Sequence, residues 1–311
     1  MKIWRAASAV DADWLPTVVA IGKFDGVHLG HRALLSELVD RAEEQALTPV
    51  VLTFDRNPLA VLAPERNPES LIGPRQRVSL LESLGVSAVL ELEFNGALAE
   101  LGAVDFIERY LVDALQAKTV VVGEGFRFGA QGRGTVDLLR SQGASLGFRV
   151  KEVPAISLGD QIISSSRIRG LLAAGDVLAA AVLLGRPHQT TGLVEHGRKL
   201  GRTIGFPTAN ISRDAEGMLP ADGVYAGWLW VGGTRYPAAH SVGTNDSVGE
   251  VPRLVESHVI GRNDLDLYDQ LATVEYLEQI RGWAKFESMD ALVHQIGADV
   301  ESARLTLQRY E

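Results

Sequence analysis

The first half of the chain alternates short runs of β-branched residues with longer helix-like segments. The expected strands cover residues 18–21, 50–54, 86–90, 119–122 and 148–153, and the expected helices cover residues 31–45, 75–84, 104–115 and 135–141. Each helical segment is long enough to return the chain so that the next strand runs parallel to the previous one. The pattern predicts an α/β domain with an open, Rossmann-like parallel sheet, helices on both faces, and ligands beyond the carboxyl ends of the strands.

The pattern changes near residue 186, where Gly185 and Pro187 follow a helical stretch. Strand-like runs then cover residues 223–231, 234–239, 253–260 and 273–277, and the Gly232-Gly233 pair joins the first two as a hairpin turn. These runs predict a small antiparallel β-barrel. The tail carries Leu292, Ile296 and Val300 at four-residue spacing, which predicts an amphipathic terminal helix that closes one end of the barrel. We therefore predict two domains, residues 1–186 and 187–311.

Composition narrows the classes of protein that the chain can belong to. Its 311 residues carry a net charge of −9, and the pI near 5.4 argues against a broad phosphate-backbone footprint for DNA or RNA. The absence of cysteine excludes disulfides, thiolate metal sites and cysteine nucleophiles. The start resembles no signal peptide, and no stretch is long and apolar enough to span a bilayer. We expect a cytoplasmic monomer or transient homo-oligomer with no nucleic-acid or membrane partner.

The densest motif lies between the first expected strand and its helix and reads Gly22-Lys23-Phe24-Asp25-Gly26-Val27-His28-Leu29-Gly30-His31. The glycines allow the backbone to approach a phosphate, and a helix that begins near His31 offers unpaired N–H groups at its positive end. His28 and His31 can donate hydrogen bonds to charge that develops on a nucleotide α-phosphate. Each histidine could instead cap a helix or fill a gap in the core. The combined signal favours catalysis by the two histidines and nucleotide binding by Gly22, Phe24, Asp25, Gly26 and Gly30.

A second motif covers residues 163–169 and places Ser164, Ser165 and Ser166 just before an apolar helix. Serines at such a position are ordinary N-caps. Arg167 and Arg169 add charged donors that suit the β- and γ-phosphates leaving as pyrophosphate. We expect Arg167 to act in catalysis and the other four residues to bind the nucleotide.

A third motif, residues 122–129, follows another expected strand and so lies on the ligand-binding edge of the sheet. Phe126 and Phe128 are typical of core residues in a turn. Gly123 and Arg127 are candidates for binding phosphate or flavin. No Walker A pattern occurs in the chain, so phosphate chemistry must use these motifs instead.

These three motifs, followed by Leu183-Leu184-Gly185-Arg186-Pro187, resemble the FMN adenylyltransferase module of the prokaryotic bifunctional riboflavin kinase/FMN adenylyltransferase (FAD synthetase) family. In the second half, residues 197–210 resemble the riboflavin kinase signature of the same family, a glycine-rich loop that leads into Pro207-Thr208-Ala209-Asn210. The resemblance covers essentially the whole chain. It implies ATP-dependent phosphorylation of riboflavin to FMN and adenylylation of FMN to FAD.

The resemblance also implies residue roles in the second half. Thr208 and Asn210 would hold the Mg²⁺ of MgATP, since both offer hard oxygen ligands, although such residues also occur in polar turns. The phosphate-wrapping loop would use Gly201, Arg202, Gly205 and Pro207. By the same resemblance, Glu256 would be the general base that takes the proton of the ribityl 5′-hydroxyl. Strand alternation places it on one face with His258. Read without the family, Glu256 is typical of a solvent-facing acid.

The chain departs from the family pattern at four places. Gly125 replaces an Asn or Asp, and Asn57 replaces a His near the same pocket. Residues 243–248 replace a Gly-x-x-Pro-Thr-Phe motif, and Gly261 replaces an Asp. These departures leave open a diverged paralogue that acts on an altered flavin or another nucleotide, or that has lost one activity. A non-catalytic flavin- or nucleotide-binding protein is disfavoured, because a binding module would not need both histidines together with Glu256.

Overall fold

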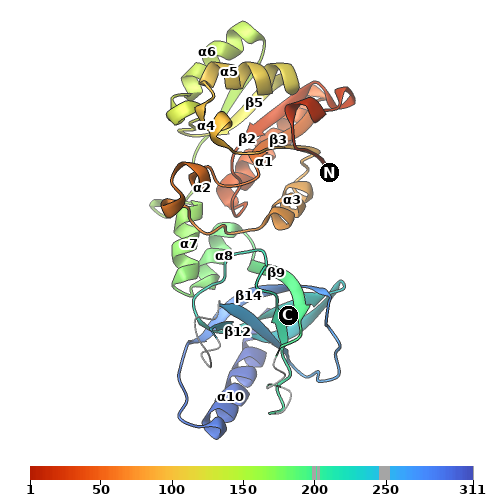
Figure 1. The fold of residues 1–311 in the computed structure, drawn as a ribbon, viewed down its shortest axis with the longest axis vertical. Coiled ribbons are helices and arrows are strands. Elements are labelled where there is room, and N and C mark those ends of the chain that lie inside the picture. The colour runs from red at the N-terminus through yellow and green to blue at the C-terminus, as the bar shows by residue number, and fades with distance from the viewer. Residues whose placement is uncertain (198–200, 202–203, 245–252, 311) are drawn as a thin grey trace. The chain divides into compact units, whose positions relative to one another are not determined.

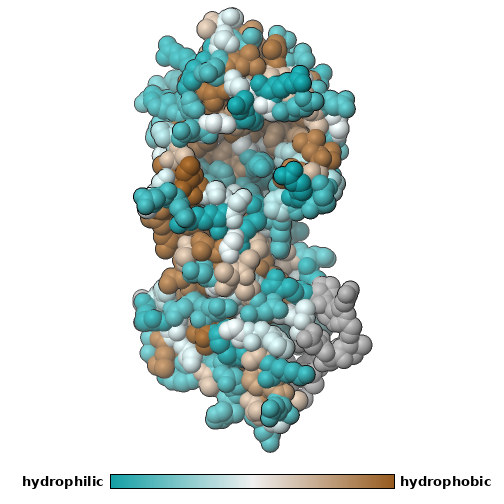
Figure 2. All heavy atoms as spheres, turned by 90° about the vertical axis from the view of Figure 1, so that its left-hand side faces the viewer, coloured by the Kyte–Doolittle hydropathy of each residue, from teal (hydrophilic) through white to brown (hydrophobic). Residues whose placement is uncertain are grey.

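The computed structural model describes residues 1–197, 201, 204–244 and 253–310, which form two compact units. Unit 1 contains residues 1–69 and 77–163, and unit 2 contains residues 70–76 and 164–311. In the part of the chain that the structure describes, no helix is both long and apolar enough to cross a membrane. Hydrophilic residues cover much of the face drawn in Figure 2, and hydrophobic residues lie among them in small patches.

Unit 1 is built on a six-stranded parallel sheet with the strand order β1-β4-β3-β2-β5-β6, as the sequence pattern predicts (Figure 1). The strands are β1 (Lys2–Trp4), β2 (Thr17–Ile21), β3 (Thr48–Phe54), β4 (Ala88–Leu92), β5 (Ala117–Gly123) and β6 (Arg149–Val153). The helices are α1 (Leu29–Gln45), α2 (Leu59–Leu62), α4 (Gly96–Glu100), α5 (Ala103–Phe106) and α6 (Val136–Leu146). A π-helix (Ile107–Ala114) continues α5, and a small hairpin joins β7 (Ser157–Leu158) to β8 (Gln161–Ile162).

Helices cover both faces of this sheet. On one face, Val19 and Ile21 of β2 belong to a core with residues of α5, the π-helix and α6. The residues that alternate with them, Val18 and Ala20, are also fully buried, and α1 packs against β2, β3, β5 and β6. Strands buried on both faces read as continuous apolar runs, which is why the central strands were visible in the sequence.

Unit 1 also contains four short 3₁₀ helices, and one further helix is divided between the two units. The 3₁₀ helices are Ala7–Ala9, Ala12–Trp14, Pro64–Arg66 and Ala130–Gly132. The helix α3 (Pro74–Ser83) has its first residues in unit 2 and its remainder in unit 1.

Unit 2 is a closed six-stranded barrel with the order β10-β13-β12-β11-β14-β9, in which every neighbouring pair is antiparallel. The strands are β9 (His188–Glu195), β10 (Ala209–Ile211), β11 (Gly223–Val231), β12 (Thr234–Gly243), β13 (Leu254–Val259) and β14 (Leu271–Gly282). The helices are α7 (Ser165–Ala173), α8 (Val177–Leu184) and α10 (Met289–Leu307).

The predicted hairpin turn and terminal helix are both present in unit 2. Gly232 and Gly233 have φ angles of 56° and 80°, which suit a tight turn between β11 and β12. The helix α10 starts after Ser288, whose side chain caps it, and packs against β11, β12 and β14 (Figure 1). The predicted fold class is therefore confirmed in both halves.

Candidate functional site

The histidine motif of unit 1 forms a tight loop between β2 and α1. Phe24, Gly26 and Val27 all have positive φ angles, of 51°, 87° and 41°. Such angles are uncommon for phenylalanine and valine, so the surrounding structure must hold them in place. Phe24 is fully buried and its ring lies 5.3 Å from that of His31 between centroids. The buried ring anchors the loop below the histidines.

His28 is the N-cap of α1, and the helix begins at Leu29, two residues earlier than the motif suggested. The His28 Nδ1 accepts a hydrogen bond from the backbone N–H of His31 at 3.3 Å. A neutral imidazole whose Nδ1 accepts carries its proton on Nε2. Capping and phosphate chemistry are thus compatible, because the cap fixes the ring and leaves Nε2 as its N–H donor.

His31 stacks on His28 with 3.8 Å between ring centroids and 16° between ring planes. Burial, with smaller contributions from the charges of His28 and Lys23, holds the pKa of His31 well below its usual value. The buried Nδ1 of His31 finds no hydrogen-bond partner among the described residues. An unpaired buried nitrogen is costly in a purely structural role, so it supports a ligand-binding one.

Two glycines of the motif pack closely against these rings. A Cβ at Gly30 would lie 3.1 Å from the Cε1 of His28, and a Cβ at Gly22 would lie 3.1 Å from the Phe24 ring. Both distances are shorter than ordinary van der Waals contact. The sequence reasoning assigned these glycines to phosphate approach, and the structure adds that a side chain at either one would press on the rings.

The third motif follows β5 and divides its residues between the core and the surface. Phe126 and Phe128 stack at 5.7 Å and pack against the core, so the core interpretation of these aromatics holds. Arg127 between them is exposed. Gly125 has a φ of 68°, and an added Cβ there would have no heavy atom within 4 Å. The position therefore has room for a side chain.

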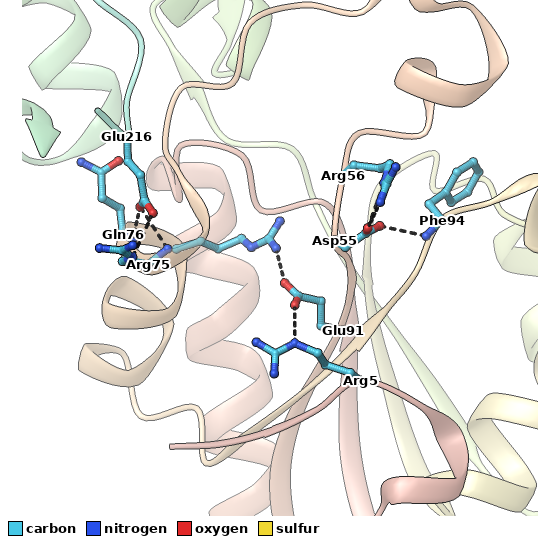
Figure 3. Close-up of polar contacts among 9 residues, drawn as sticks. Arg5, Asp55, Arg56, Arg75, Gln76, Glu91, Phe94 and Glu216 are labelled. Atoms are coloured by element: carbon cyan, nitrogen blue, oxygen red, sulfur yellow. Dashed lines mark hydrogen bonds and ion pairs between the residues drawn. The ribbon is translucent and has the colours of Figure 1, made fainter. Parts of the chain in front are cut away.

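The loop after β3 contains a braced carboxylate that the sequence reasoning did not single out. Asp55 accepts hydrogen bonds from the backbone N–H of Phe94, at 2.8 Å, and from the guanidinium of Arg56 (Figure 3). Partial burial acts to raise the pKa of Asp55, but these hydrogen bonds outweigh it and hold the pKa below its usual value. Asn57, which replaces a family histidine, accepts from the N–H of Leu59 at 3.1 Å and so orders the start of α2.

The serine-arginine motif opens unit 2. Ser164 is the N-cap of α7 and its hydroxyl accepts from the N–H of Arg167 at 3.3 Å, as expected of an N-cap. Ser166 is exposed, and Arg167 and Arg169 are half-buried. Because His28 and His31 belong to unit 1, a shared nucleotide site for both motifs remains a prediction.

The barrel of unit 2 carries a continuous row of paired residues, one from each strand. The pairing partners connect strands β9, β10, β13, β12, β11 and β14 in that order. Residues directly opposite each other in antiparallel strands point to the same face of the sheet. The row consists of Glu195, Asn210, Glu256, Ser241, Val224 and Arg281.

All six residues of this row line one cavity of about 830 Å³. The helix α10 contributes the apolar side chains Leu292, Ile296 and Val300 to the same cavity, so the stripe seen in the sequence closes the barrel and also forms a cavity wall. The volume lies within the usual range for cofactor and small-molecule sites. The cavity wall formed by α10 is therefore mostly apolar, whereas the wall formed by the row of paired residues is mostly polar.

Thr208, Asn210 and Glu256, the barrel residues expected to act on MgATP and on the attacking hydroxyl, lie close together in the structure. Asn210 and Glu256 are cross-strand partners on β10 and β13. The Thr208 hydroxyl donates to the Glu256 carboxylate at 3.4 Å, and the Asn210 amide lies 3.5 Å from the Thr208 carbonyl oxygen. His258 of the same strand hydrogen-bonds through Nδ1 to the Pro207 carbonyl oxygen at 2.9 Å, which ties the Pro-Thr-Ala-Asn segment to β13.

Two described residues of the glycine-rich loop that precedes Pro207, Gly201 and Phe206, contact each other. The Phe206 N–H donates to the Gly201 carbonyl oxygen at 2.8 Å, and a Cβ on Gly201 would collide with the Phe206 carbonyl oxygen. Gly205 has a φ of 88°, which favours glycine. Arg202 and Lys199 of this loop lie outside the described residues. So do residues 245–248, which belong to the segment that differs from the Gly-x-x-Pro-Thr-Phe motif of the family. Gly261 has a φ of 79° and open space around it.

A buried ion pair in the same cavity was missed by the sequence reasoning. Asp299 of α10 is almost fully buried and accepts from the guanidinium of Arg281 on β14. The two residues are 18 positions apart and lie on different elements, so no local pattern connects them.

Family models match both halves of the chain. The FAD synthetase model matches residues 10–167, and the riboflavin kinase model matches residues 184–307.

Curated relatives match over nearly the full length. The chain is 37% identical to the bifunctional riboflavin kinase/FMN adenylyltransferase of Pseudomonas fluorescens over 305 residues, which cover 98% of this chain and 97% of that protein. The Escherichia coli K12 protein of the same name is 37% identical, with 92% and 91% of the two chains covered. The Bacillus subtilis protein of that name is 35% identical, again with 92% and 91% covered.

A solved structure shares the fold as well. The chain described as a macrolide-efflux protein from Streptococcus pneumoniae superposes with a TM-score of 0.88 at 33% identity, and the match covers 97% of this chain and 98% of that one. The motifs, the two folds and the full-length relatives agree. This chain belongs to the bifunctional riboflavin kinase/FMN adenylyltransferase family.

Proposed function

We propose that this chain is a bifunctional cytoplasmic enzyme that phosphorylates riboflavin to FMN and adenylylates FMN to FAD, with ATP as co-substrate in both steps. The observation that carries the proposal is the row of paired residues in the barrel. It sets hard oxygen ligands and a carboxylate at one part of a cavity whose other wall is apolar. A phosphoryl donor needs the first feature, and an aromatic flavin ring needs the second.

In the kinase half, Glu256 is the proposed general base. The riboflavin 5′-oxygen bonds to the γ-phosphorus of ATP while the bond from that phosphorus to the β–γ bridging oxygen breaks and ADP leaves. The hydroxyl proton passes to the Glu256 carboxylate. Support comes from its place beside Thr208 and Asn210, at 3.4 Å from the Thr208 hydroxyl, because a base must lie next to the phosphates to act on an attacking hydroxyl.

Mg²⁺ suits the donors that surround Glu256. Thr208 and Asn210 offer neutral hard oxygens, and the neighbouring carboxylate supplies negative charge, which is the set that Mg²⁺ prefers when it also keeps waters and ATP phosphates. We propose that Thr208 and Asn210 hold it. When bound, Mg²⁺ neutralises charge on the phosphates.

In the adenylyltransferase half, His28 and His31 are the proposed catalytic donors. A phosphate oxygen of FMN bonds to the α-phosphorus of ATP, and pyrophosphate leaves. The histidines donate N–H groups to charge on the α-phosphate, and Arg167 and Arg169 take the leaving pyrophosphate. Support comes from the stacked pair of rings, in which the His28 cap fixes the orientation of the His28 ring.

A diverged paralogue is the second candidate, and Gly125 is the observation that favours it. The position has room for the Asn or Asp of the family and lacks it. Such a chain would keep nucleotide chemistry but take another flavin or have lost one activity.

Product analysis decides between the two candidates. The purified chain is incubated with Mg²⁺, ATP and either riboflavin or FMN, and the flavins are separated by chromatography. We expect FMN from riboflavin and FAD from FMN. Formation of only one product, or turnover only with other flavins or nucleoside triphosphates, would favour the diverged paralogue, and no product with any of them would contradict both.

A further inference from the structure

The ion pair between Arg281 and Asp299 lies at one end of the row of paired residues. Asn210 and Glu256, the residues of the row that are proposed to act at the phosphates, lie toward the other end. Arg281 is the last described partner in the row, and Asp299 of α10 accepts hydrogen bonds from it. The Asp299 side chain is only 6% exposed, while that of Arg281 is 24% exposed. The carboxylate is therefore enclosed, and the guanidinium remains open toward the cavity that both residues line.

Both carboxylate oxygens of Asp299 accept hydrogen bonds from Arg281. The Arg281 Nε donates to both carboxylate oxygens at 3.0 Å, and one terminal nitrogen donates at 2.8 Å. Gln295, one turn earlier on α10, donates to the same carboxylate at 2.8 Å. This network fixes the plane of the guanidinium, because a side-on, two-nitrogen contact allows only one orientation.

The guanidinium keeps unused donors. Its five N–H groups include one bonded to the Gly282 carbonyl oxygen at 3.0 Å and two bonded to Asp299. The other two have no partner in the part of the chain that the structure describes. Phe286 lies against the guanidinium, with 5.4 Å from its ring centroid to the Arg281 Cζ. Arg281 therefore has two N–H groups without a partner among the described residues. Asp299 holds its guanidinium in place, and the ring of Phe286 lies against that guanidinium.

Stability alone gives little reason for this pair. Enclosing the Asp299 carboxylate costs desolvation free energy, and replacing a buried ion pair by apolar side chains of similar volume is often neutral or stabilising. An ion pair retained beside a ligand cavity has a use when it holds a donor in place. The pair between Arg304 and Glu301 on the same helix shows the contrast, since both of its side chains are about half exposed.

Strand register sets the distance between Arg281 and the phosphate end. Glu256, Ser241, Val224 and Arg281 lie on four successive strands. Neighbouring strands are about 4.8 Å apart, so Arg281 lies about 14 Å from Glu256 along the curved sheet. A ribityl chain whose 5′-hydroxyl lay at Glu256 would reach toward Arg281 if it followed this row, and apolar residues of α10 line the same cavity. The ring system at its other end carries carbonyl oxygens, which accept hydrogen bonds.

We propose that Arg281 binds a carbonyl oxygen of the isoalloxazine ring and that Asp299 is the positioning residue that orients it. The proposal rests on the riboflavin kinase function proposed above. It makes Arg281 a determinant of flavin affinity with no part in phosphoryl transfer.

The test uses the full-length chain and a pair of matched double variants. Arg281→Met/Asp299→Leu removes both charges at once, so that no buried charge is left unpaired. Arg304→Met/Glu301→Leu makes the same chemical change at the exposed pair of α10. Riboflavin binding is measured by the quenching of its fluorescence without ATP, thermal unfolding is followed by circular dichroism, and the KM for ATP is measured separately.

We expect Arg281→Met/Asp299→Leu to unfold within a few degrees of the wild-type chain and to bind riboflavin about 10- to 100-fold more weakly, the effect of losing hydrogen bonds to a charged donor. The KM for ATP should change less than twofold, and the control should match the wild type throughout. Riboflavin affinity within twofold of wild type in the folded variant would overturn the proposal.

A single variant covers the case in which the double variant does not fold. Arg281→Lys keeps the charge beside Asp299 but loses the planar fork, so it should fold and still bind riboflavin at least about fivefold more weakly. Unchanged affinity would again overturn the role of Arg281. Failure of the underlying kinase function is a separate result, because the wild-type chain would then neither bind riboflavin nor form FMN.

Discussion

At the scale of single residues, His28 and His31 stack with 3.8 Å between their ring centroids. The cap on Nδ1 orients His28, and burial keeps His31 uncharged. We predict that His28→Ala or His31→Ala lowers FMN adenylylation by at least about 100-fold, since each removes a donor to the developing charge. Riboflavin phosphorylation should stay within about twofold. Both rates are measured on the same preparations by chromatography.

The control for this prediction is His294→Ala, which removes an exposed imidazole from α10. It should leave both rates unchanged. Equal loss of both activities in folded His28 or His31 variants would contradict the assignment of the two reactions to separate sites.

Gly125 allows a second test at this scale. The position has a φ of 68° and open space for a side chain, and Asn tolerates this backbone region better than most residues. We predict that Gly125→Asn raises FMN adenylylation, by up to about tenfold if the new hydrogen bond forms in the transition state. Gly125→Ala is the matched control, because it imposes similar backbone strain without an amide. A fall with Asn as large as that with Ala would mean that the pocket is organised around glycine.

The sequence named several of the residues that line the barrel cavity. Thr208, Asn210 and Glu256 were named from the resemblance to the family, and in the barrel they are neighbours. Arg281 and Asp299 were not found, because their pairing depends on where α10 lies against the barrel. A long-range ion pair leaves no spacing signal along the chain.

At the scale of elements, buried apolar strands were predictable and short or polar ones were not. The strand β9 carries the sequence His-Gln-Thr-Thr-Gly-Leu-Val-Glu, in which buried polar residues replace the usual apolar alternation. Strands β1 and β10 have three residues each, too few for a period to appear. Their partners in the sheet and barrel decide that they are strands.

The polar interior of the barrel predicts a stability that depends on pH. Burial lowers the pKa of His188 to about 4 and that of His240 to about 3, while an unfolded histidine titrates near its usual 6.5. Below pH 6.5 the unfolded chain therefore binds more protons than the folded one. The free energy of unfolding should be flat above pH 7 and fall by roughly 1.4 kcal/mol per pH unit for each histidine as pH drops from 6.5 toward 4.

Urea unfolding of the full-length chain between pH 8 and pH 5, followed by tryptophan fluorescence, measures this slope. His188→Gln can keep a donor for the Met218 carbonyl oxygen that His188 contacts at 2.6 Å, and it should flatten the slope below pH 6.5. His294→Gln changes an exposed histidine and should not. A wild-type chain whose stability is the same at pH 7 and pH 5 would show that these histidines are not held neutral.

At the scale of the whole molecule, the compact units divide differently from the predicted domains. The prediction put the boundary between residues 186 and 187, after the helical stretch that ends the first half of the chain, because the sequence pattern changes there. The structure groups α7, α8 and residues 70–76 with the barrel. Composition shows where strands replace helices, but it does not show which helices pack on which strands.

The additional segments make specific contacts within unit 2. The Ala221 N–H donates to the Leu172 carbonyl oxygen of α7 at 2.8 Å, and α8 packs against β9 and β14. The Gln76 side chain donates to Gln189 and Thr191 of β9, and the Glu216 carboxylate accepts from the N–H groups of Arg75 and Gln76 at the start of α3 (Figure 3).

These contacts decide which fragment of the chain should fold by itself. A fragment of residues 187–311 loses α7 and α8 and exposes the apolar surface that α8 covers, whereas residues 164–311 keep both helices and lose only residues 70–76. We predict that both fragments fold, and that the longer one is more stable by at least about 2 kcal/mol, since burial of one large apolar side chain contributes about that much and α8 buries Leu183 and Leu184. Urea unfolding of the two fragments measures the difference, and riboflavin phosphorylation by each shows whether the barrel is intact. Equal stability would support the boundary at residue 187, while a longer fragment that stays unfolded would mean that residues 70–76, with the Gln76 and Glu216 contacts, are indispensable to the barrel.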